Sequence, residues 1–407
     1  MLRTIDLRGR DLAPADLADL LPRAGTDPGT AQTAVHALLD EVRTRGSEAL
    51  LEQADRFDGG RPPAVRVPAD EIRAAAEALP AAIRTALELA AQRVGAASRA
   101  QLPQPAVTAF GDGATVRQRW LPVRRVGLYV PGGRAVYPSS VVMNVVPAQV
   151  AGVAEIAVAS PAQRAFGGRV HPVILGAAGL LGVGEVYAMG GAGAIGAFAF
   201  GVPDIGLARV DVVTGPGNVY VAAAKRAVSG RVGIDAEAGP TEILVIADAA
   251  ADARLVAADL VSQAEHDPLA AAVLVTDDLE FAREVDRAVR EHAGRTRHAD
   301  RVREALTGPQ SAVVLVDDLD AAVTVANAYA PEHLEVQTAD PGALVPRLTE
   351  AGAVFVGPAT PVSLGDYLAG SNHELPTGGT ARFSSRLTVR PFLRQQQLVD
   401  YDAAALA

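Results

Sequence analysis

The sequence predicts an α/β fold that contains two doubly wound parallel sheets in succession. After Trp120, short apolar runs alternate with segments of helical periodicity, and a second series of the same kind follows Pro240. Such alternation is typical of parallel sheets that are covered by helices on both faces. The 407 residues are enough for two or three domains, each with its own core. We therefore expect two Rossmann-like domains.

The predicted elements follow in chain order. Apolar residues recur at helical spacing in 30–57 and 69–100, with a Gly- and Pro-rich turn between them. Candidate strands are 125–130, 155–159, 185–189 and 210–213 in the first series, and 243–246, 272–275, 312–316 and 353–356 in the second. Helices are expected from Val141, Pro172, Ala192 and Val219. The expected domains are an N-terminal arm (1–25), one α/β domain (119–238), a discontinuous second one (26–118 plus 239–380) and a C-terminal tail (381–407).

Composition excludes several classes of function. The formal net charge of -10 disfavours binding to nucleic acid or to an anionic membrane. The N-terminus lacks the apolar core of a secretion signal, and no apolar stretch reaches bilayer length, so we expect a cytoplasmic protein. The chain has no cysteine, which excludes disulfides, thiolate metal sites and covalent aldehyde oxidation through a thiol. Any aldehyde oxidation must use water.

Three glycine-containing loops follow candidate strands. Residues 191–196 form a G-x-G-x-x-G pattern, which lets main-chain N–H groups approach a pyrophosphate at a helix N-terminus. In a chain rich in Gly and Ala, the alternative is close packing of a helix. In the loop 215–218, Asn218 is a candidate for a hydrogen bond to a cofactor or for the cap of the next helix. In the loop 129–133, Tyr129 stands where a ring can lie against a nucleotide. Together the loops favour a nucleotide site at the strand ends.

Gln263 and His266 are three residues apart near the end of a predicted helix, so they share one face. An imidazole nitrogen and an amide oxygen on one face can bind a metal, although a structural histidine is the more common case. Asp366, in a later loop rich in Gly and polar residues, is the candidate that completes a nitrogen and oxygen ligand set.

Glu332 and His333 follow a predicted helix and enter a strand. At the mouth of a strand both side chains can reach a cleft, where burial brings the pKa of a Glu toward neutrality for proton transfer. The alternative is an exposed charged turn. His373 is the other histidine of the late Gly- and Pro-rich loop.

Several long segments together resemble one family, histidinol dehydrogenase. They are GLYVPGGRAVYPSSVVMNVVPA from Gly127, TGPGNVYVAAAKR from Thr214, GIDAEAGPTEILVIAD from Gly233, SQAEHDP from Ser262, PEHLEVQT from Pro331 and SLGDYLAGSNHELPTGGTAR from Ser363. The resemblance extends from near Leu7 to about Asp402. It implies an aldehyde-dehydrogenase-like arrangement of the two domains, with NAD bound by 119–238 and zinc and substrate by the other domain.

The family's reaction is the oxidation of L-histidinol through histidinal to L-histidine with two NAD, the last step of histidine biosynthesis. Carried over by position, the resemblance implies zinc ligands at Gln263, His266 and Asp366, and substrate contacts at these three and at Thr241, His333 and His373. It implies that Glu332 and His333 are the acid/base pair and that Tyr129, Gly193 and Asn218 contact NAD. It also implies a homodimer whose active site is shared between subunits.

Two departures from the family pattern stand out. At Gly193 many relatives carry a polar side chain that contacts NAD, so only main-chain contacts are expected here. The family continues past this C-terminus with a substrate-binding Glu and a zinc-binding His, and Asp402 is expected to cap a helix that is unfinished at Ala407. Two alternatives follow: a paralogue that oxidises another polar alcohol such as a sulfonated diol, or a non-catalytic dimeric homologue. The joint presence of Gln263, His266 and Asp366 disfavours the paralogue.

Overall fold

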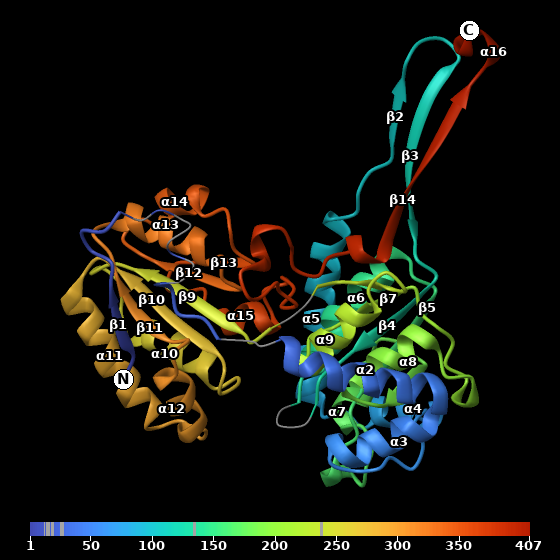
Figure 1. Cartoon of the computed structure of the whole chain (residues 1–407), viewed down its shortest axis with the longest axis horizontal. Helices are drawn as coiled ribbons and strands as arrows, with labels where there is room; N and C mark the ends of the chain where they lie inside the picture. The colour runs from blue at the N-terminus through green and yellow to red at the C-terminus, as the bar shows by residue number, and fades with distance from the viewer. Residues whose placement is uncertain (12, 14–16, 18–19, 25–27, 133–135, 237–238) are drawn as a thin grey trace. The chain divides into compact units, whose positions relative to one another are not determined.

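The computed structural model describes the chain except residues 12, 14–16, 18–19, 25–27, 133–135 and 237–238. The described residues form two compact α/β units, as predicted (Figure 1). Unit 1 comprises Met1–Gly29, Ala236–Tyr367 and Leu375–Arg386, and unit 2 comprises Thr30–Asp235, Leu368–Glu374 and Leu387–Ala407. Within these described ranges, no helix is both long enough and apolar enough to cross a bilayer.

Unit 2 is built on a five-stranded parallel sheet in the order β6-β5-β4-β7-β8. Its strands are β4 (Arg125–Tyr129), β5 (Glu155–Ser160), β6 (Glu185–Ala188), β7 (Val212–Thr214) and β8 (Gly233–Ile234). Successive side chains of β5 enter opposite cores, because Val158 packs in one cluster and Ala157 and Ala159 in the other. Both faces of this sheet are therefore buried.

The helices of unit 2 divide between these two faces. On one face lie α4 (Ala69–Glu77), α5 (Ala81–Ala100), α6 (Pro138–Ala151) and α7 (Pro172–Leu180), and on the other lie α2 (Pro28–Arg45), α3 (Ser47–Gln53), α8 (Gly191–Phe200) and α9 (Val219–Val228). Short turns of helix are η1 (Ala54–Asp58), η2 (Arg164–Phe166) and η3 (Pro203–Ile205). This is the doubly wound architecture that the β–α alternation predicted.

Unit 1 contains a six-stranded parallel sheet in the order β1-β11-β10-β9-β12-β13. Its strands are β1 (Arg3–Asp6), β9 (Glu242–Ala247), β10 (Ala271–Thr276), β11 (Ala312–Leu315), β12 (His333–Gln337) and β13 (Ala353–Val356). One face is covered by α10 (Ala253–Ala264), α11 (Leu279–Ala293) and α12 (Ala299–Thr307), and the other by α13 (Leu319–Tyr329) and α14 (Pro341–Leu344). The remaining helical segments are η4 (Val345–Arg347), α15 (Val362–Tyr367) and η5 (Thr380–Arg382).

A three-stranded antiparallel ribbon, in the order β14-β3-β2, projects from the rest of unit 2 (Figure 1). It contains β2 (Ala106–Ala109), β3 (Ala114–Pro122) and β14 (Leu393–Tyr401), and it is followed by α16 (Ala403–Leu406); η6 (Arg390–Phe392) precedes β14. Asp402 caps α16, because its carboxylate accepts a hydrogen bond from the N–H of Ala405 at 2.8 Å. The C-terminal segment thus lies outside both parallel sheets, as expected, but it forms a strand that the sequence analysis did not anticipate.

The domain boundaries differ from the predicted ones in two respects. The segment 1–25 was expected to be an arm, but β1 within it pairs in parallel with β11 and forms an edge of the unit 1 sheet. The segment 26–118 was assigned with 239–380, yet Thr30 onward groups with unit 2. The physical reason is packing: the helices of this segment bury their apolar faces on the unit 2 sheet, and the N–H of Val67 donates to the carbonyl of Val186 at the edge of β6.

The close packing of β4 against α8 yields a stability prediction. A Cβ at Gly127 would lie 2.4 Å from Cγ of Phe198, so Gly127→Ala must displace a buried ring and should cost about 1–3 kcal/mol. Gly184→Ala is the matched control, because no atom lies within 4 Å of its Cβ position, and it should change stability by less than about 1 kcal/mol. Thermal unfolding measures both; equal melting temperatures for the two variants would contradict this packing.

Candidate functional site

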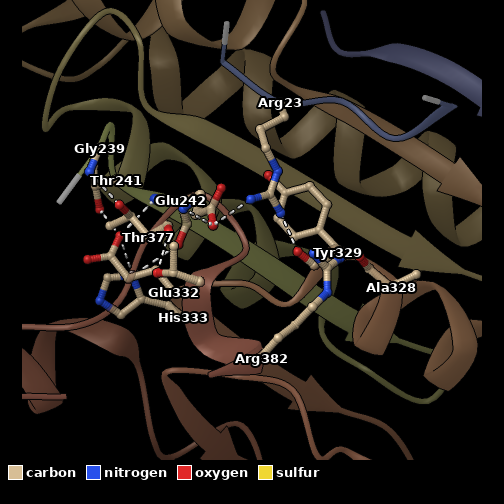
Figure 2. Close-up of polar contacts among 12 residues, drawn as sticks. Arg23, Gly239, Thr241, Glu242, Ala328, Tyr329, Glu332, His333, Thr377 and Arg382 are labelled. Atoms are coloured by element: carbon tan, nitrogen blue, oxygen red, sulfur yellow. Dashed lines mark hydrogen bonds and ion pairs between the residues drawn. The ribbon is translucent and has the colours of Figure 1, made fainter. Parts of the chain in front are cut away.

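The predicted acid/base pair lies at the amino end of β12 in unit 1. His333 is the first residue of this strand and Glu332 precedes it, while Thr241 precedes the neighbouring strand β9 (Figure 2). Glu332 and His333 are 7 % and 5 % exposed, so the alternative of an exposed charged turn is wrong. Parallel pairing of β9 and β12 brings Thr241 next to Glu332 and His333, which lie about 90 positions later in the chain.

The carboxylate of Glu332 is held by two donors from β9 and the residue before it. Its Oε2 accepts hydrogen bonds from Thr241 Oγ1 at 2.6 Å and from the main-chain N–H of Glu242 at 2.9 Å. Burial raises the pKa of Glu332 to about 7, while these two hydrogen bonds favour the charged form and oppose the rise. The carboxyl group can therefore gain or lose a proton near neutral pH.

His333 is fixed by the carbonyl of the same residue, Glu242. Its Nδ1 lies 3.1 Å from this oxygen, which can only accept, so Nδ1 donates and Nε2 of the neutral ring carries the lone pair. Burial lowers the pKa of His333, whereas the charge of Asp366 and the carbonyl of Glu242 oppose that shift. The imidazole is therefore a neutral base at physiological pH.

Gln263 joins the same hydrogen-bonded cluster from the last turn of α10. Its Nε2 donates to Thr241 Oγ1 at 2.8 Å, and Thr241 in turn donates to Glu332. With the amide nitrogen bonded to Thr241, the amide oxygen is the remaining acceptor of the Gln263 side chain. The side chain of Gln263 is 6 % exposed, so this orientation is set by packing as well as by the hydrogen bond.

His266 and Asp366 are connected to the cluster through His333. Burial lowers the pKa of His266, and the charge of His333 lowers it further. Burial lowers the pKa of His333, and the charge of Asp366 opposes that shift. Burial raises the pKa of Asp366 to about 6. Over the part of the chain that the structure describes, no group of three or more His, Cys, Asp or Glu is arranged to hold a metal. The predicted ligand set of Gln263, His266 and Asp366 contains only one His and one Asp beside an amide, so it falls outside that definition of a metal-binding group.

Glu242 is a member of the site that the sequence analysis did not identify. Its Oε1 accepts from the N–H of Gly378 at 3.0 Å and lies 3.6 Å from a guanidinium nitrogen of Arg23, which stacks on the ring of Tyr329 (Figure 2). Burial raises the pKa of Glu242 to about 7, and Arg23 opposes this. The available signal was a lone carboxylate at the head of the apolar run EILVIA. This anchored residue supplies both main-chain groups that hold the acid/base pair.

His373 groups with unit 2 rather than with this cluster. Its Nε2 lies 3.3 Å from Oγ of Ser140 on α6 and 3.7 Å from Oε1 of Glu374. Asn144, also on α6, donates to Glu374 at 3.0 Å and accepts from Thr214 at the end of β7. These buried polar contacts tie the loop that carries His373 to the carboxyl end of the unit 2 sheet. A contact of His373 with substrate stays a prediction.

The three predicted cofactor residues also lie in unit 2. Tyr129 is 5 % exposed, and its hydroxyl accepts from the N–H of Gly191 at 3.3 Å. Asn218 caps α9, because its Oδ1 accepts from the N–H groups of Tyr220 and Val221. A Cβ at Gly193 would lie 2.3 Å from Oε1 of Gln53, which is the close packing named as the alternative for this loop. Their contacts with NAD stay predictions.

Asp58 was missed because it lies in the turn after the first helices. A Cβ at Gly190 would lie 2.5 Å from its carboxylate, so Asp58 adjoins the start of α8. Burial raises the pKa of Asp58 to about 7. Burial also raises the pKa of Tyr129, and the charge of Asp58 adds to that shift. No motif in the sequence marked this carboxylate.

Comparison with known proteins gives the family. The family model described as "Histidinol dehydrogenase" matches residues 21–407. Histidinol dehydrogenase of Leifsonia xyli subsp. xyli is 63% identical over 100% of this chain and 93% of its own, and that of Mycolicibacterium smegmatis is 55% identical over 99% and 91%.

Solved structures agree on the fold. The crystal structure of histidinol dehydrogenase from Elizabethkingia anophelis is 30% identical, with a TM-score of 0.91 over 100% of this chain and 92% of that one. An acetylating aldehyde dehydrogenase from Geobacillus thermoglucosidasius is 12% identical, with a TM-score of 0.51 over 91% and 97%, which is a likeness of fold alone. With a matching model across nearly its whole length and relatives more than half identical to it, the chain belongs to the histidinol dehydrogenase family.

Proposed function

We propose that this chain oxidises L-histidinol through histidinal to L-histidine, with two NAD as hydride acceptors and a zinc ion in the substrate site. The observation that carries the proposal is the buried pair Glu332 and His333, held side by side by the main chain of residue 242. One carboxyl and one imidazole group near neutral pKa suit two successive proton transfers. The names of the related enzymes supply the substrate.

His333 acts in the first oxidation. Its neutral ring donates from Nδ1 to the carbonyl of Glu242, so Nε2 is the atom that accepts the proton of the carbinol hydroxyl. As this O–H bond breaks, a hydride passes from the carbinol carbon to the first NAD, and histidinal forms. Because burial keeps the pKa of His333 low, the ring is available as a base at the start of each turnover.

Glu332 acts in the second oxidation. Its carboxylate takes one proton from a water molecule as the oxygen adds to the aldehyde carbon, and the hydrate forms as its monoanion. The C–H bond of the hydrate then breaks, its hydride passes to the second NAD, and a proton leaves with formation of the carboxylate product. A Glu with a pKa of about 7 can accept this proton and release it again at neutral pH. The absence of cysteine from the chain leaves this water route open.

Gln263, His266 and Asp366 are the residues that would hold zinc. An amide oxygen, an imidazole nitrogen and a carboxylate form a donor set that zinc accepts. The pKa of Asp366 is raised to about 6 because its charge is buried, and a bound cation would remove that cost. When bound, zinc would orient and polarise the substrate.

The NAD site is assigned to the loops at the carboxyl ends of β4 and β7 and at the start of α8. The sheet order places β4 beside β7, where the connections turn to opposite sides, and such switch points are where open α/β sheets bind ligands. The side chains of Tyr129 and Asn218 are engaged within unit 2. We therefore assign the cofactor contacts chiefly to main-chain groups of these loops.

The functional form is proposed to be a homodimer that shares its active sites. The ribbon of β2, β3 and β14 exposes large apolar side chains, among them Val107 (66 % exposed) and Val399 (69 %). These two lie on opposite faces of the ribbon. Val107 pairs with Arg117 and Val399 pairs with Val116, and the adjacent residues Val116 and Arg117 of β3 point to opposite faces. Exposed apolar groups on both faces of a projecting ribbon favour burial against a second copy.

The direct test is NADH formation from L-histidinol with saturating zinc, followed by the same assay after chelation. We expect two NADH per histidinol, loss of activity with the chelator and recovery with zinc. His266→Ala and Asp366→Ala should also lose bound zinc in elemental analysis. No turnover with zinc would contradict the proposal; turnover of a sulfonated diol in place of histidinol would support the paralogue.

Glu332→Gln should separate the two oxidations. The amide oxygen can still accept from Thr241 and Glu242, so the fold is retained, but the side chain cannot take a proton from water. We expect oxidation of histidinal to fall about 10²–10⁴-fold, more than hydride transfer from histidinol in a single turnover. Thr349→Val, at an exposed position, is the control. Equal loss in both steps would exclude this assignment.

The pH profile of histidinal oxidation follows from the same pKa. Glu332 must be ionised to act as a base, so the rate should fall about tenfold per pH unit below about 7 and level off above it. The residual rate of Glu332→Gln should lack this acid limb. Rates measured from pH 5 to 9 at saturating NAD test the expectation, and an identical limb in the variant would assign it to another group.

Charge on the ribbon should dissociate the dimer. In Val107→Asp/Val399→Asp each carboxylate would be buried at the proposed interface, so we expect light scattering to report a monomer. Leu255→Asp places the same charge on the exposed surface of α10 and should leave the mass unchanged. A double variant that stays dimeric would show that the ribbon is not the interface.

A further inference from the structure

Lys225 is the only lysine of the chain; apart from the seven histidines, every other basic side chain is an arginine. It lies on α9 and is 2 % exposed. The single lysine ammonium group of this arginine-rich chain is therefore at a buried position. The two cations differ in shape, because an ammonium is a compact point charge with three donors, whereas a guanidinium is a wide planar fork. The position of Lys225 is therefore one where shape matters as well as charge.

Lys225 and Asp235 together hold both polar main-chain groups of one glycine. Lys225 Nζ donates to the carbonyl of Gly215 at 2.9 Å and forms an ion pair with Asp235 Oδ1, and Asp235 Oδ2 accepts from the N–H of Gly215 at 2.9 Å. Asp235 is itself 9 % exposed in its side chain. The peptide groups on either side of Gly215 are thus fixed by one buried ion pair.

Gly215 begins the loop 215–218 that is assigned to the cofactor. Its φ is +114°, and a Cβ here would lie 1.9 Å from the carbonyl oxygen of Tyr129, so the loop is in direct contact with the end of β4. Tyr129 in turn accepts from the N–H of Gly191 at the start of α8. The ion pair therefore lies at one end of a series of contacts that connects all three glycine loops.

Stability alone does not explain such a pair. Desolvation of two charges offsets most of their attraction, so a buried ion pair adds little net stability relative to an apolar pair of the same volume. The ion pair instead restricts the loop 215–218 to one conformation. A loop that binds a dinucleotide through main-chain groups needs that geometry before the ligand arrives.

We propose that the Lys225–Asp235 ion pair is a positioning device that fixes the loop 215–218 in its dinucleotide-binding conformation. Neither side chain touches the cofactor; both act through Gly215. The inference rests on the proposed function, because it requires that this chain bind NAD at these loops. It adds the residues on which the affinity of that site depends.

The test is direct binding of NADH, followed by its fluorescence, to the full-length protein and to Lys225→Met. We expect the dissociation constant to rise about tenfold. Asp235→Asn should also raise the NADH dissociation constant. Because the two residues act as one unit, the double variant should bind no more weakly than the weaker single variant. Zinc content, which depends on unit 1, should stay at the wild-type value.

Arg125→Met is the matched control. Arg125 is a cation of similar burial at the amino end of β4, the central strand of the same sheet. Its side chain is 3 % exposed and is paired with Glu155 at 2.9 Å and Glu185 at 2.6 Å. Its loss should lower the melting temperature while leaving the NADH dissociation constant within about twofold. Amide hydrogen exchange of residues 212–218 should increase in Lys225→Met and not in Arg125→Met.

Three outcomes would overturn the inference. If Lys225→Met and Asp235→Asn both bind NADH as tightly as the wild type, the ion pair does not position the loop. If Arg125→Met weakens binding as much as Lys225→Met, the effect is one of stability. A wild-type protein that binds no NADH would overturn the proposed function and this inference with it, whereas unchanged affinity in the variants would leave the proposed function standing.

Discussion

The site in unit 1 depends on the main-chain N–H and carbonyl groups of one residue, Glu242, at the head of a buried strand. The N–H of Glu242 donates to Glu332, and the carbonyl of the same residue receives Nδ1 of His333. Parallel pairing offers these two groups to the neighbouring strand, where they would ordinarily continue the ladder. Here both groups bind side chains, the carbonyl in addition to its pairing with β12. The backbone of residue 242 thereby orients Glu332 and sets the tautomer of His333, while burial shifts the pKa of each.

The need to fix the main chain of residue 242 also explains why the carboxylate of Glu242 is buried despite the free-energy cost of desolvation. Its pKa is raised to about 7, and its partners are the N–H of Gly378 and the guanidinium of Arg23. An apolar residue would avoid the desolvation, but it would leave the head of β9 without these anchors. Arg23 comes from the N-terminal segment and Gly378 from the late loop. Two distant parts of unit 1 are thus fixed to the residue that holds the acid/base pair.

Much of the fold follows from the sequence because parallel sheets buried on both faces leave a strong pattern. Runs such as 243–246 and 272–275 are apolar throughout, and helices of ordinary length lie between them. The ribbon leaves no such pattern: β14 has the sequence LRQQQLVDY, and its partner β3 lies more than 270 residues earlier. A polar strand whose partner is that distant in sequence cannot be identified from local periodicity. For the same reason β1, four residues long, was missed.

The domain boundary shows a different limit. The helices between residues 30 and 100 have clear apolar faces, but an amphipathic face records only that a helix is buried, not which sheet buries it. In the candidate site, spacing predicted that Gln263 and His266 share a helix face, but α10 ends at Ala264 and His266 lies in the turn after it. The entry of His333 into a strand is confirmed. Residue spacing could not predict the role of Glu242, because the groups that hold Glu332 and His333 are its main-chain N–H and carbonyl, which every residue except proline possesses.

The two units place their functional groups at opposite edges of similar sheets. In unit 2 the glycine loops follow β4, β6 and β7 at the carboxyl ends of the strands, where loops are free to adopt the positive φ of Gly191 and Gly215. In unit 1 the titratable pair lies at the amino end of β12, where Glu332 precedes the strand and His333 begins it, next to the paired strand β9. A site that accommodates a large ligand through main-chain groups benefits from loop geometry, whereas proton transfer needs donors and acceptors at fixed distances. The chemistry assigned to each unit thus matches the rigidity of the edge that bears it.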